Sequence, residues 1–244
     1  MDYIDIIMPA YNCEEYIENA INTVKKQTYK NWNLIIVNDY STDGTKNKIL
    51  ENVNEKIQLI DLKSHVGVAE ARNVGIKKSK NRYIDFLDAD DMWKENKLYE
   101  QLKFMKQNEY EFTFTPFSYL KNGKIKCVKK IPSKLNYNQA LKNTIILTST
   151  VMIDQAKVKN IKMPKIESED TATWWSILKQ GYTANGLNEN LTVYRVHEKG
   201  LSFNKIIGIK RVWNLYRKCE GLTYFKTLYC FMNYAMNAVK KRVV

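Results

Sequence analysis

Residues 4 to 91 alternate short apolar runs with segments of helical periodicity, and this alternation constrains the possible folds more than any other feature. The apolar runs lie at residues 4–8, 34–37, 57–62 and 83–87, and the helical segments at 17–24, from 45 onward and at 69–78. Near-continuous apolar strands separated by helices are typical of a mostly parallel sheet covered on both faces. Ligands of such sheets bind outside the carboxyl ends of the strands. The sequence therefore predicts an α/β fold with a ligand site at that edge.

The fourth apolar run ends in three carboxylates, Asp88, Asp90 and Asp91. Like charges about 4 Å apart repel by roughly 4 kcal/mol at an effective dielectric near 20, so this cluster favours a bound cation. Carboxylate oxygens suit a hard divalent ion such as Mg²⁺ or Mn²⁺, which commonly binds one or two carboxylates together with substrate phosphates. Taken alone, an acidic helix start before Lys94 explains the same residues equally well.

Polar, turn-forming residues also follow the other expected strands. They are residues 9–12 after the first strand, residues 38–44 after the second and residues 64–73 after the third. The last of these loops leads to Arg72, in the first turns of a helix. An arginine there opposes the helix dipole but suits a phosphate or a nucleobase edge. We expect the three loops and the acidic cluster to converge on one crevice.

The pattern loosens after Asp91. We expect a hairpin from residues 111–119 and 124–130, helices at 137–143 and 170–180, and strands at 149–153, 183–187 and 191–196. This second half is expected to complete the sheet and to shape a second pocket. The predicted organisation is a catalytic domain of residues 1–204, divided at residue 91, followed by a helical tail of residues 205–244.

Positive charge is concentrated in that tail. The chain has a formal net charge of +13, and residues 205–244 contain nine Lys/Arg against one Glu, a net of +8. Apolar residues recur there at helix spacing, but Lys226, Asn233 and Asn237 interrupt them. A membrane-spanning helix needs about 20 apolar residues, so a helix lying on an anionic membrane surface fits better. The alternative is a tail packed on the catalytic domain or on the partner in a homodimer.

The N-terminus and the cysteines indicate a cytoplasmic protein. Acids at Asp2 and Asp5 occupy the place where a signal peptide has its basic region. The cysteines show no paired or zinc-type spacing, and we expect reduced thiols; they are Cys13, Cys127, Cys219 and Cys230. With the basic tail, this favours a peripheral location on the inner face of the cell membrane.

Six segments, in this order and spacing, resemble the family 2 glycosyltransferases of the GT-A fold, particularly bacterial enzymes that build capsule, O-antigen or lipopolysaccharide sugars. They are residues 7–12, 37–45, 67–75, 86–91, 169–170 and 194–197. The resemblance implies a Rossmann-like GT-A domain with a mostly parallel central sheet and a C-terminal helical extension. It also implies metal-dependent, inverting transfer of a hexose or N-acetylhexosamine from a UDP-sugar to a saccharide acceptor carried on a lipid.

The resemblance assigns roles in the donor site. Asp39 resembles the acid that binds the uracil ring, and residues that line the base or nucleotide are Pro9, Ala10, Tyr11, Asp43, Arg72 and Ala89. Asp88 is similar to the residue that faces the ribose or the metal, and Asp90 to the direct ligand of Mn²⁺ or Mg²⁺. Asp91 is expected to orient its neighbours.

The resemblance assigns the acceptor side as well. Asp170 resembles the catalytic base, although Glu169 and Asp170 alone read as an acidic helix start before Trp174 and Trp175. His197, with Arg195, resembles a late motif that reaches the diphosphate or the metal. The two tryptophans offer either an aromatic face for an acceptor sugar or core packing, which is the more common use.

Two positions depart from the family pattern. Tyr40 stands where the family usually has glycine, so the turn after the second strand must avoid a positive φ or tolerate strain. Asn38 replaces a common aspartate and removes one charge beside Asp39.

Two other classes of protein are the alternatives. A sugar nucleotidyltransferase would share the fold, but such enzymes generally use a glycine- and arginine-rich phosphate loop, which residues 9–13 lack. A nucleic-acid-binding module would explain the charge and the 12% aromatic content. The basic excess lies on an apolar tail, however, and no RNA-binding signature occurs, so we expect no nucleic-acid partner.

Overall fold

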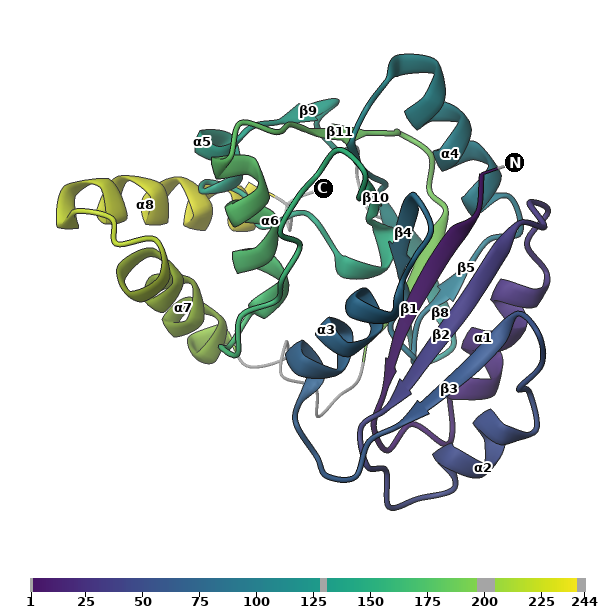
Figure 1. The fold of residues 1–244 in the computed structure, drawn as a ribbon. Helices are drawn as coiled ribbons and strands as arrows, with labels where there is room; N and C mark the ends of the chain where they lie inside the picture. The colour runs from purple at the N-terminus through teal and green to yellow at the C-terminus, as the bar shows by residue number, and fades with distance from the viewer. Residues whose placement is uncertain (1, 128–130, 197–204, 241–244) are drawn as a thin grey trace.

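The computed structural model describes residues 2–127, 131–196 and 205–240 (Figure 1). The first half alternates strands and helices: β1 (Ile4–Ala10), α1 (Ile17–Lys25), β2 (Trp32–Asn38), α2 (Thr45–Leu50), β3 (Ile57–Asp61), α3 (Val68–Lys78) and β4 (Tyr83–Phe86). These four strands lie in the order β3-β2-β1-β4, and all three pairings are parallel. The predicted parallel half-sheet is therefore confirmed.

Apolar clusters lie on both faces of this half-sheet at β1. Successive residues of a strand point to opposite sides, so neighbouring residues of β1 pack in different clusters. Ile6 packs in a cluster with Ile17 and Ile21 of α1. Its neighbour Ile7 packs in a second cluster with Ala71 of α3. Helices α1 and α2 accordingly lie on one side of the sheet and α3 on the other (Figure 1).

The second half extends the same sheet with antiparallel as well as parallel strands. The added strands are β10 (Met152–Asp154), β6 (Phe112–Phe114), β11 (Ala184–Gly186) and β9 (Lys134–Leu135), giving the order β3-β2-β1-β4-β10-β6-β11-β9. β10 is antiparallel to both β4 and β6, whereas β11 is parallel to β6. The sheet is thus parallel in its first half and mixed in its second.

A second sheet was not expected from the sequence. It contains β5 (Met92–Trp93), β12 (Thr192–Arg195), β7 (Phe117–Lys121) and β8 (Lys124–Cys127) in that order. β7 and β8 form the predicted hairpin. The expected strand at residues 111–119 is divided, however, because β6 lies in the first sheet and β7 in the second. Pro116 stands at the division, where its missing N–H prevents a continuous ladder.

The remaining helices lie close to their predicted places. They are α4 (Lys97–Asn108), α5 (Tyr137–Ala140), a short 3₁₀ helix η1 (Thr148–Thr150) and α6 (Glu169–Lys179). η1 occupies the start of the strand predicted at 149–153. α5 begins at a capping box, in which Asn136 and Gln139 each accept a backbone hydrogen bond from the other. Ser168 precedes α6 in the left-handed conformation, with φ at 60°. The chain therefore changes direction just before α6, which begins with Glu169 and Asp170.

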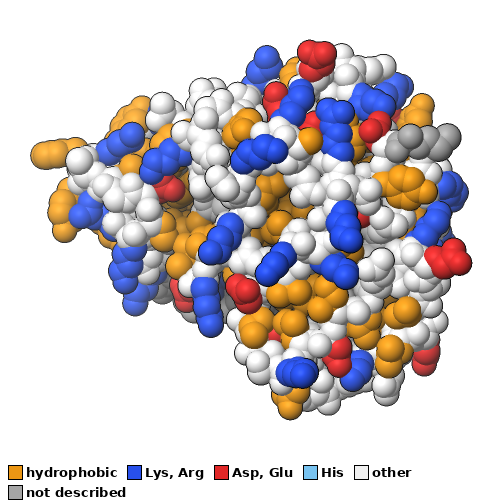
Figure 2. Space-filling view, viewed as in Figure 1, with side chains coloured by type: hydrophobic (Ala, Val, Ile, Leu, Met, Phe, Trp, Pro, Cys, Tyr) orange, Lys and Arg blue, Asp and Glu red, His pale blue; other side chains and the backbone are white. Residues whose placement is uncertain are grey.

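The tail is helical and packs on the second half of the chain. It consists of α7 (Lys205–Asn214), a π-helical turn η2 (Leu215–Cys219) and α8 (Tyr224–Lys240). The ring of Tyr216 stacks on Trp175 of α6, with centroids 5.4 Å apart. Figure 2 shows the tail as a projecting end of the molecule that carries hydrophobic and basic side chains. Within the described residues, no helix combines the length and the hydropathy needed to cross a bilayer.

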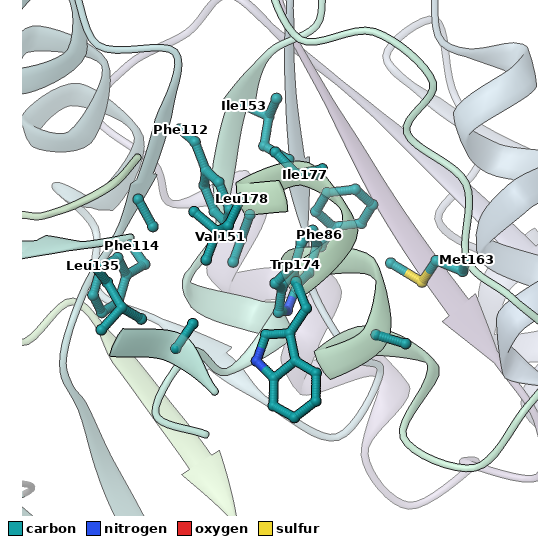
Figure 3. Packing of buried hydrophobic residues seen from close by; sticks show 14 of the residues in the cluster. Phe86, Phe112, Phe114, Leu135, Val151, Ile153, Met163, Trp174, Ile177 and Leu178 are labelled. Carbon is teal, nitrogen blue, oxygen red and sulfur yellow. The ribbon is translucent and has the colours of Figure 1, made fainter. Parts of the chain in front are cut away.

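The two adjacent tryptophans serve the core rather than a sugar-binding surface. Trp174 lies between Phe86 and Phe112, with ring centroids 5.6 Å from each (Figure 3). Trp175 is buried under the tail. The core-packing alternative therefore holds for both residues, and α6 is fixed to the sheet at the point where it presents Asp170.

Candidate active site

A cleft of about 550 Å³ lies at the carboxyl ends of β1, β2 and β4. Its lining includes eight residues predicted for the donor site, namely Pro9, Ala10, Tyr11, Asp39, Arg72, Asp88, Ala89 and Asp90, but neither Asp43 nor Asp91. The loops after the three strands supply most of these residues, as expected from a parallel sheet. The expected crevice is thus present.

Asp39 is held in one orientation by its surroundings. Its carboxylate is 2% exposed and accepts hydrogen bonds from the backbone N–H groups of Val66 (2.7 Å) and Gly67 (2.8 Å). His65 Nδ1 lies 2.9 Å from the same carboxylate. Gly67 has a φ of 91°, which only glycine adopts readily, so this loop can turn its amides toward the acid. A carboxylate offers about four acceptor positions, which leaves one for a ligand N–H.

His65 is a cleft residue that sequence reasoning missed. Its ring stacks on Tyr11 with centroids 4.1 Å apart and an interplanar angle of 29°. The two rings come from the loops after β3 and β1 and form one wall of the cleft. No sequence motif marks His65 as a site residue. Its place in the cleft becomes clear only from the strand order, in which β2 lies between β1 and β3.

Asp43, which was predicted to contact the nucleotide, does not line the first cleft. One carboxylate oxygen accepts from Thr45 N (3.0 Å) and the other from Glu14 N (3.1 Å). These bonds join the loop after β2 to the loop after β1 and lower the pKa of Asp43 against the effect of burial, which alone would raise it. Asp43 therefore shapes the cleft from behind its lining.

The two departures from the family pattern, Tyr40 and Asn38, have different structural consequences. Tyr40 adopts a φ of 61°, so the turn tolerates the left-handed conformation rather than avoiding it. Asn38 donates to Asp61 at 2.7 Å and accepts from the Ser41 hydroxyl at 2.6 Å, which ties the ends of β2 and β3 together. An aspartate could not donate the first of these bonds.

A second cleft, of about 750 Å³, joins the first at the acidic cluster. Asp170 lines the second cleft, and the residues common to both clefts are Gly67, Val68, Arg72, Asp88 and Asp90. Asp170 lies in the first turn of α6, and the Thr148 hydroxyl donates to it at 3.3 Å. Asp39, Asp90 and Asp170 therefore belong to one continuous depression rather than to separate surfaces.

Arg72 connects the two sides of this depression. Its buried guanidinium lies 2.6 Å from Asp88 and 2.6 Å from Glu169. Burial alone would lower the pKa of Arg72, but the two carboxylates raise it above its ordinary value. Burial raises the pKa of Glu169 although Arg72 opposes the shift. The arginine thus fixes α6, and with it Asp170, relative to the acidic cluster.

Asp91 anchors the acidic loop from below. It is fully buried and accepts from the Ser149 hydroxyl (2.5 Å) and from Arg195 N (3.0 Å). Burial and then the nearby carboxylates of Asp90 and Asp88 raise its pKa well above the ordinary value. Arg195 also donates from Nε to the Asp90 carbonyl at 3.1 Å. These contacts agree with an orienting role for Asp91 and place Arg195 beside the cluster.

The predicted metal ligands fit a divalent ion only in part. Within the described residues, no group of three or more His, Cys, Asp or Glu is arranged to hold a metal. His197, a predicted ligand, lies outside the described residues. Asp88 and Asp90 do lie at the junction of the clefts. Mg²⁺ is usually held by one or two carboxylates plus phosphates and water, so these two residues suit a metal that binds together with a diphosphate.

Loops that suit a nucleotide, next to a cleft that presents a fixed carboxylate, define a group-transfer enzyme with a nucleotide-linked donor. Comparison with known proteins narrows this class to the glycosyltransferases. The chain belongs to glycosyl transferase family 2, whose sequence model matches residues 5–207. The family resemblance seen in six short segments is confirmed.

Curated relatives of similar length support the same family. The chain is 42% identical to a Bacillus subtilis protein named as a glycosyltransferase of teichuronic acid biosynthesis, TuaG, over 98% of this chain and 97% of the relative. It is 37% identical to the Escherichia coli UDP-Glc:alpha-D-GlcNAc-diphosphoundecaprenol beta-1,3-glucosyltransferase WfaP, over 99% of this chain and 96% of the relative.

Solved structures support the GT-A fold. Staphylococcus aureus TarS 1-349 in complex with UDP aligns with a TM-score of 0.71 at 16% identity, over 96% of this chain and 70% of that one. The mannosyltransferase PcManGT from Pyrobaculum calidifontis, in complex with GDP-Man and Mn²⁺, aligns with a TM-score of 0.71 at 16% identity, over 99% of this chain and 75% of that one. At this identity the likeness concerns the fold alone.

Proposed function

We propose that this glycosyltransferase moves a hexose or N-acetylhexosamine from a UDP-sugar, with inversion, to a saccharide on a lipid diphosphate. The reaction would serve the synthesis of a bacterial surface polysaccharide. The observation that carries the proposal is the junction of the clefts, where Asp88 and Asp90 line both and Asp170 lines the second. The name of WfaP supports the acceptor class, and the name of TuaG supports the process.

The first cleft is proposed to bind the UDP group. The Asp39 carboxylate retains an acceptor position that suits the imide N–H of uracil, which cytosine does not present. Tyr11 and His65 offer aromatic surface for the base. Because Val66, Gly67 and His65 hold the Asp39 carboxylate in place, little ordering is needed when the base binds.

Asp90 and Asp88 are proposed to hold Mn²⁺ or Mg²⁺ at the diphosphate, with His197 as a further predicted ligand. When bound, the divalent ion stabilises negative charge on the departing UDP. Arg72 also faces this junction, and its buried Nε has no hydrogen-bond partner among the described residues. A bound divalent ion, together with Arg72, would place positive charge where the leaving group develops negative charge.

Asp170 is proposed to act as the base. The acceptor hydroxyl oxygen forms a bond to the anomeric carbon as the bond from that carbon to the phosphate oxygen breaks. The hydroxyl proton passes to an Asp170 carboxylate oxygen, and UDP leaves with the bonding electrons. The reacting carbon gains oxocarbenium character, as in glycoside hydrolysis. The structural requirement for a base at this place is its position, which α6 and Arg72 set.

Two variants test these assignments. Asp170→Asn is expected to lower UDP release with acceptor by about a thousandfold, while UDP binding by calorimetry stays within about twofold. Asp90→Ala is expected to weaken UDP binding in Mn²⁺ but not in its absence. Glu100→Gln, which removes a carboxylate from the first turn of α4, is the matched control and should change neither quantity. Full turnover in Asp170→Asn would remove Asp170 from the role of base.

A further inference from the structure

Helix α8 is apolar on both of its sides. One side lies on the core through Thr227 and Cys230, with Phe231 and Tyr234 packed against the same cluster. The opposite side bears a row at helix spacing that is exposed by 91% at Phe225, 52% at Leu228, 56% at Met232 and 52% at Met236. Residues three or four apart lie on one face of a helix, so these side chains form a continuous stripe, here called the outer stripe.

Aromatic and basic side chains border the outer stripe. The guanidinium of Arg217 lies 3.9 Å from the ring centroid of Tyr224, and the ammonium of Lys142 lies 4.6 Å from that of Tyr229. Both tyrosines are more than half exposed. Figure 2 shows the result as hydrophobic side chains with Lys and Arg beside them at the end of the molecule formed by the tail. Tyrosines and long basic side chains with apolar stems suit the boundary between water and lipid.

The charge of the tail favours one binding partner for the outer stripe over another. Residues 205–244 carry a net charge of +8, and their one acid, Glu220, is paired with Lys179 at 3.0 Å. Two copies of the tail placed face to face would bring two such charges together, whereas an anionic lipid surface attracts each of them. We propose that the outer stripe docks the protein on an anionic lipid surface, an inference that rests on the proposed lipid-linked acceptor.

Contacts of the tail connect α8 to the second cleft. Asn237 of α8 donates to the Lys142 carbonyl at 3.0 Å, and the Tyr216 hydroxyl donates to the Leu141 carbonyl. Arg211 of α7 lines the second cleft beside Lys165 and lies 3.4 Å from Glu167. The tail therefore links the outer stripe to the wall of the cleft that holds Asp170. Docking brings that cleft to the surface where a lipid-linked saccharide resides.

The test is co-sedimentation of the full chain with vesicles of phosphatidylglycerol and phosphatidylcholine, compared with phosphatidylcholine alone. The wild type is expected to bind the anionic vesicles more tightly. Combining Phe225→Ser, Leu228→Ser and Met232→Ser is expected to weaken that binding at least about tenfold without lowering the melting temperature. Combining Leu50→Ser, Val53→Ser and Ile125→Ser, which changes exposed apolar residues elsewhere, is the control and should bind as the wild type does.

Three outcomes would overturn the docking surface. They are equal binding to both kinds of vesicle, unchanged binding by the outer-stripe variant, and a dimer in light scattering that this variant abolishes. Turnover with a short water-soluble acceptor separates this inference from the proposed function. The outer-stripe variant should retain that turnover, and a wild type that binds vesicles but transfers no sugar would contradict the proposed function alone.

Discussion

At the scale of single residues, Arg72 is the connection between the donor and acceptor sides. It reaches Asp88 after β4 and Glu169 at the start of α6 with contacts of 2.6 Å each. Glu169 lines the second cleft as well, and we expect it to act on the reaction mainly through the position of Asp170. Misplacing a catalytic group by about 1 Å can cost about a hundredfold in rate.

Glu169→Gln tests this positioning role. We expect kcat to fall by about ten- to a hundredfold, since Asp170 loses its fixed position, while KM for the donor changes less than about threefold. Asp170→Asn in the same background should then add less than it does alone, because both changes affect one unit. An unchanged kcat, or a change confined to KM, would contradict the positioning role.

A second prediction concerns the buried ion pair of Asp85 and Lys97, away from the clefts. Both side chains are fully buried in direct contact, and Lys97 lies 4.1 Å from the Trp93 ring centroid. Burial raises the pKa of Asp85 to about 6 and lowers that of Lys97 to about 8, and their mutual attraction opposes both shifts. Neither residue lines the first or the second cleft, so the expected effect is on stability.

Lys97→Met should lower the free energy of unfolding by about 3–5 kcal/mol at pH 7, because it leaves a buried carboxylate unpaired. Adding Asp85→Leu should restore most of that loss. In Lys97→Met the pKa of Asp85 stays raised above its value in the unfolded chain, so the folded state binds this proton more tightly. The free energy of unfolding is therefore higher at low pH and falls as the pH rises through the raised pKa. The single variant should thus be more stable to urea at pH 5 than at pH 8. The opposite pH trend would contradict this account.

How far the site could be predicted differs from residue to residue. Asp39, Asp90 and Asp170 were expected together and line joined clefts. Apolar spacing made the strand ends with Asp39 and Asp90 readable, whereas only the family resemblance placed Asp170 at the site. The contacts of Asp43 and His65 were not readable, since both depend on how neighbouring loops approach each other. Mn²⁺ or Mg²⁺ ligation by Asp88, Asp90 and His197 stays a prediction.

At the scale of elements, α3 approaches β1 closely because Gly75 lacks a side chain. A Cβ at this position would lie 2.5 Å from Ile7 Cγ2, which is shorter than contacts that real Cβ atoms make. Gly75→Ala should therefore destabilise the fold by about 1–3 kcal/mol despite the better helix propensity of alanine.

Gly208→Ala is the control for this prediction. Gly208 lies within α7, and a Cβ there would meet no atom within 4 Å. This change should stabilise the protein by up to about 1 kcal/mol through helix propensity alone. Thermal unfolding of both variants measures the contrast, and equal melting temperatures would mean that α3 can move away from β1 at little cost.

Elements of the first half were predicted better than those of the second. Strands β1, β2 and β4 are buried along nearly their whole length and, like β3, are separated from the next strand by helices, so period and length identify them. The second half uses strands of two to five residues, such as β5 and β9, which are too short to show a period. Their pairing partners lie far away in the sequence, and the division of residues 111–119 between two sheets is set by those partners.

At the scale of the whole molecule, the tail is an integral part of the second half of the chain. Val212, Leu215, Tyr216 and Leu222 belong to the same buried cluster as Phe86 and Trp174. The sequence left open whether the tail packs on the catalytic domain or lies on a membrane. The inner side of α8 packs on the rest of the protein, as the first alternative predicts. The outer stripe stays exposed, as the second alternative requires.

The most direct test of the joined clefts is the configuration of the product. The proposed function has the diphosphate at Asp88 and Asp90 and the acceptor on the side of Asp170, and it predicts attack from the face opposite the leaving group. Proton NMR of the disaccharide formed from a UDP-α-hexose in the first turnovers should show a β linkage. An α linkage would mean that the acceptor does not approach past Asp170, and the proposed arrangement of base, donor and acceptor would be wrong.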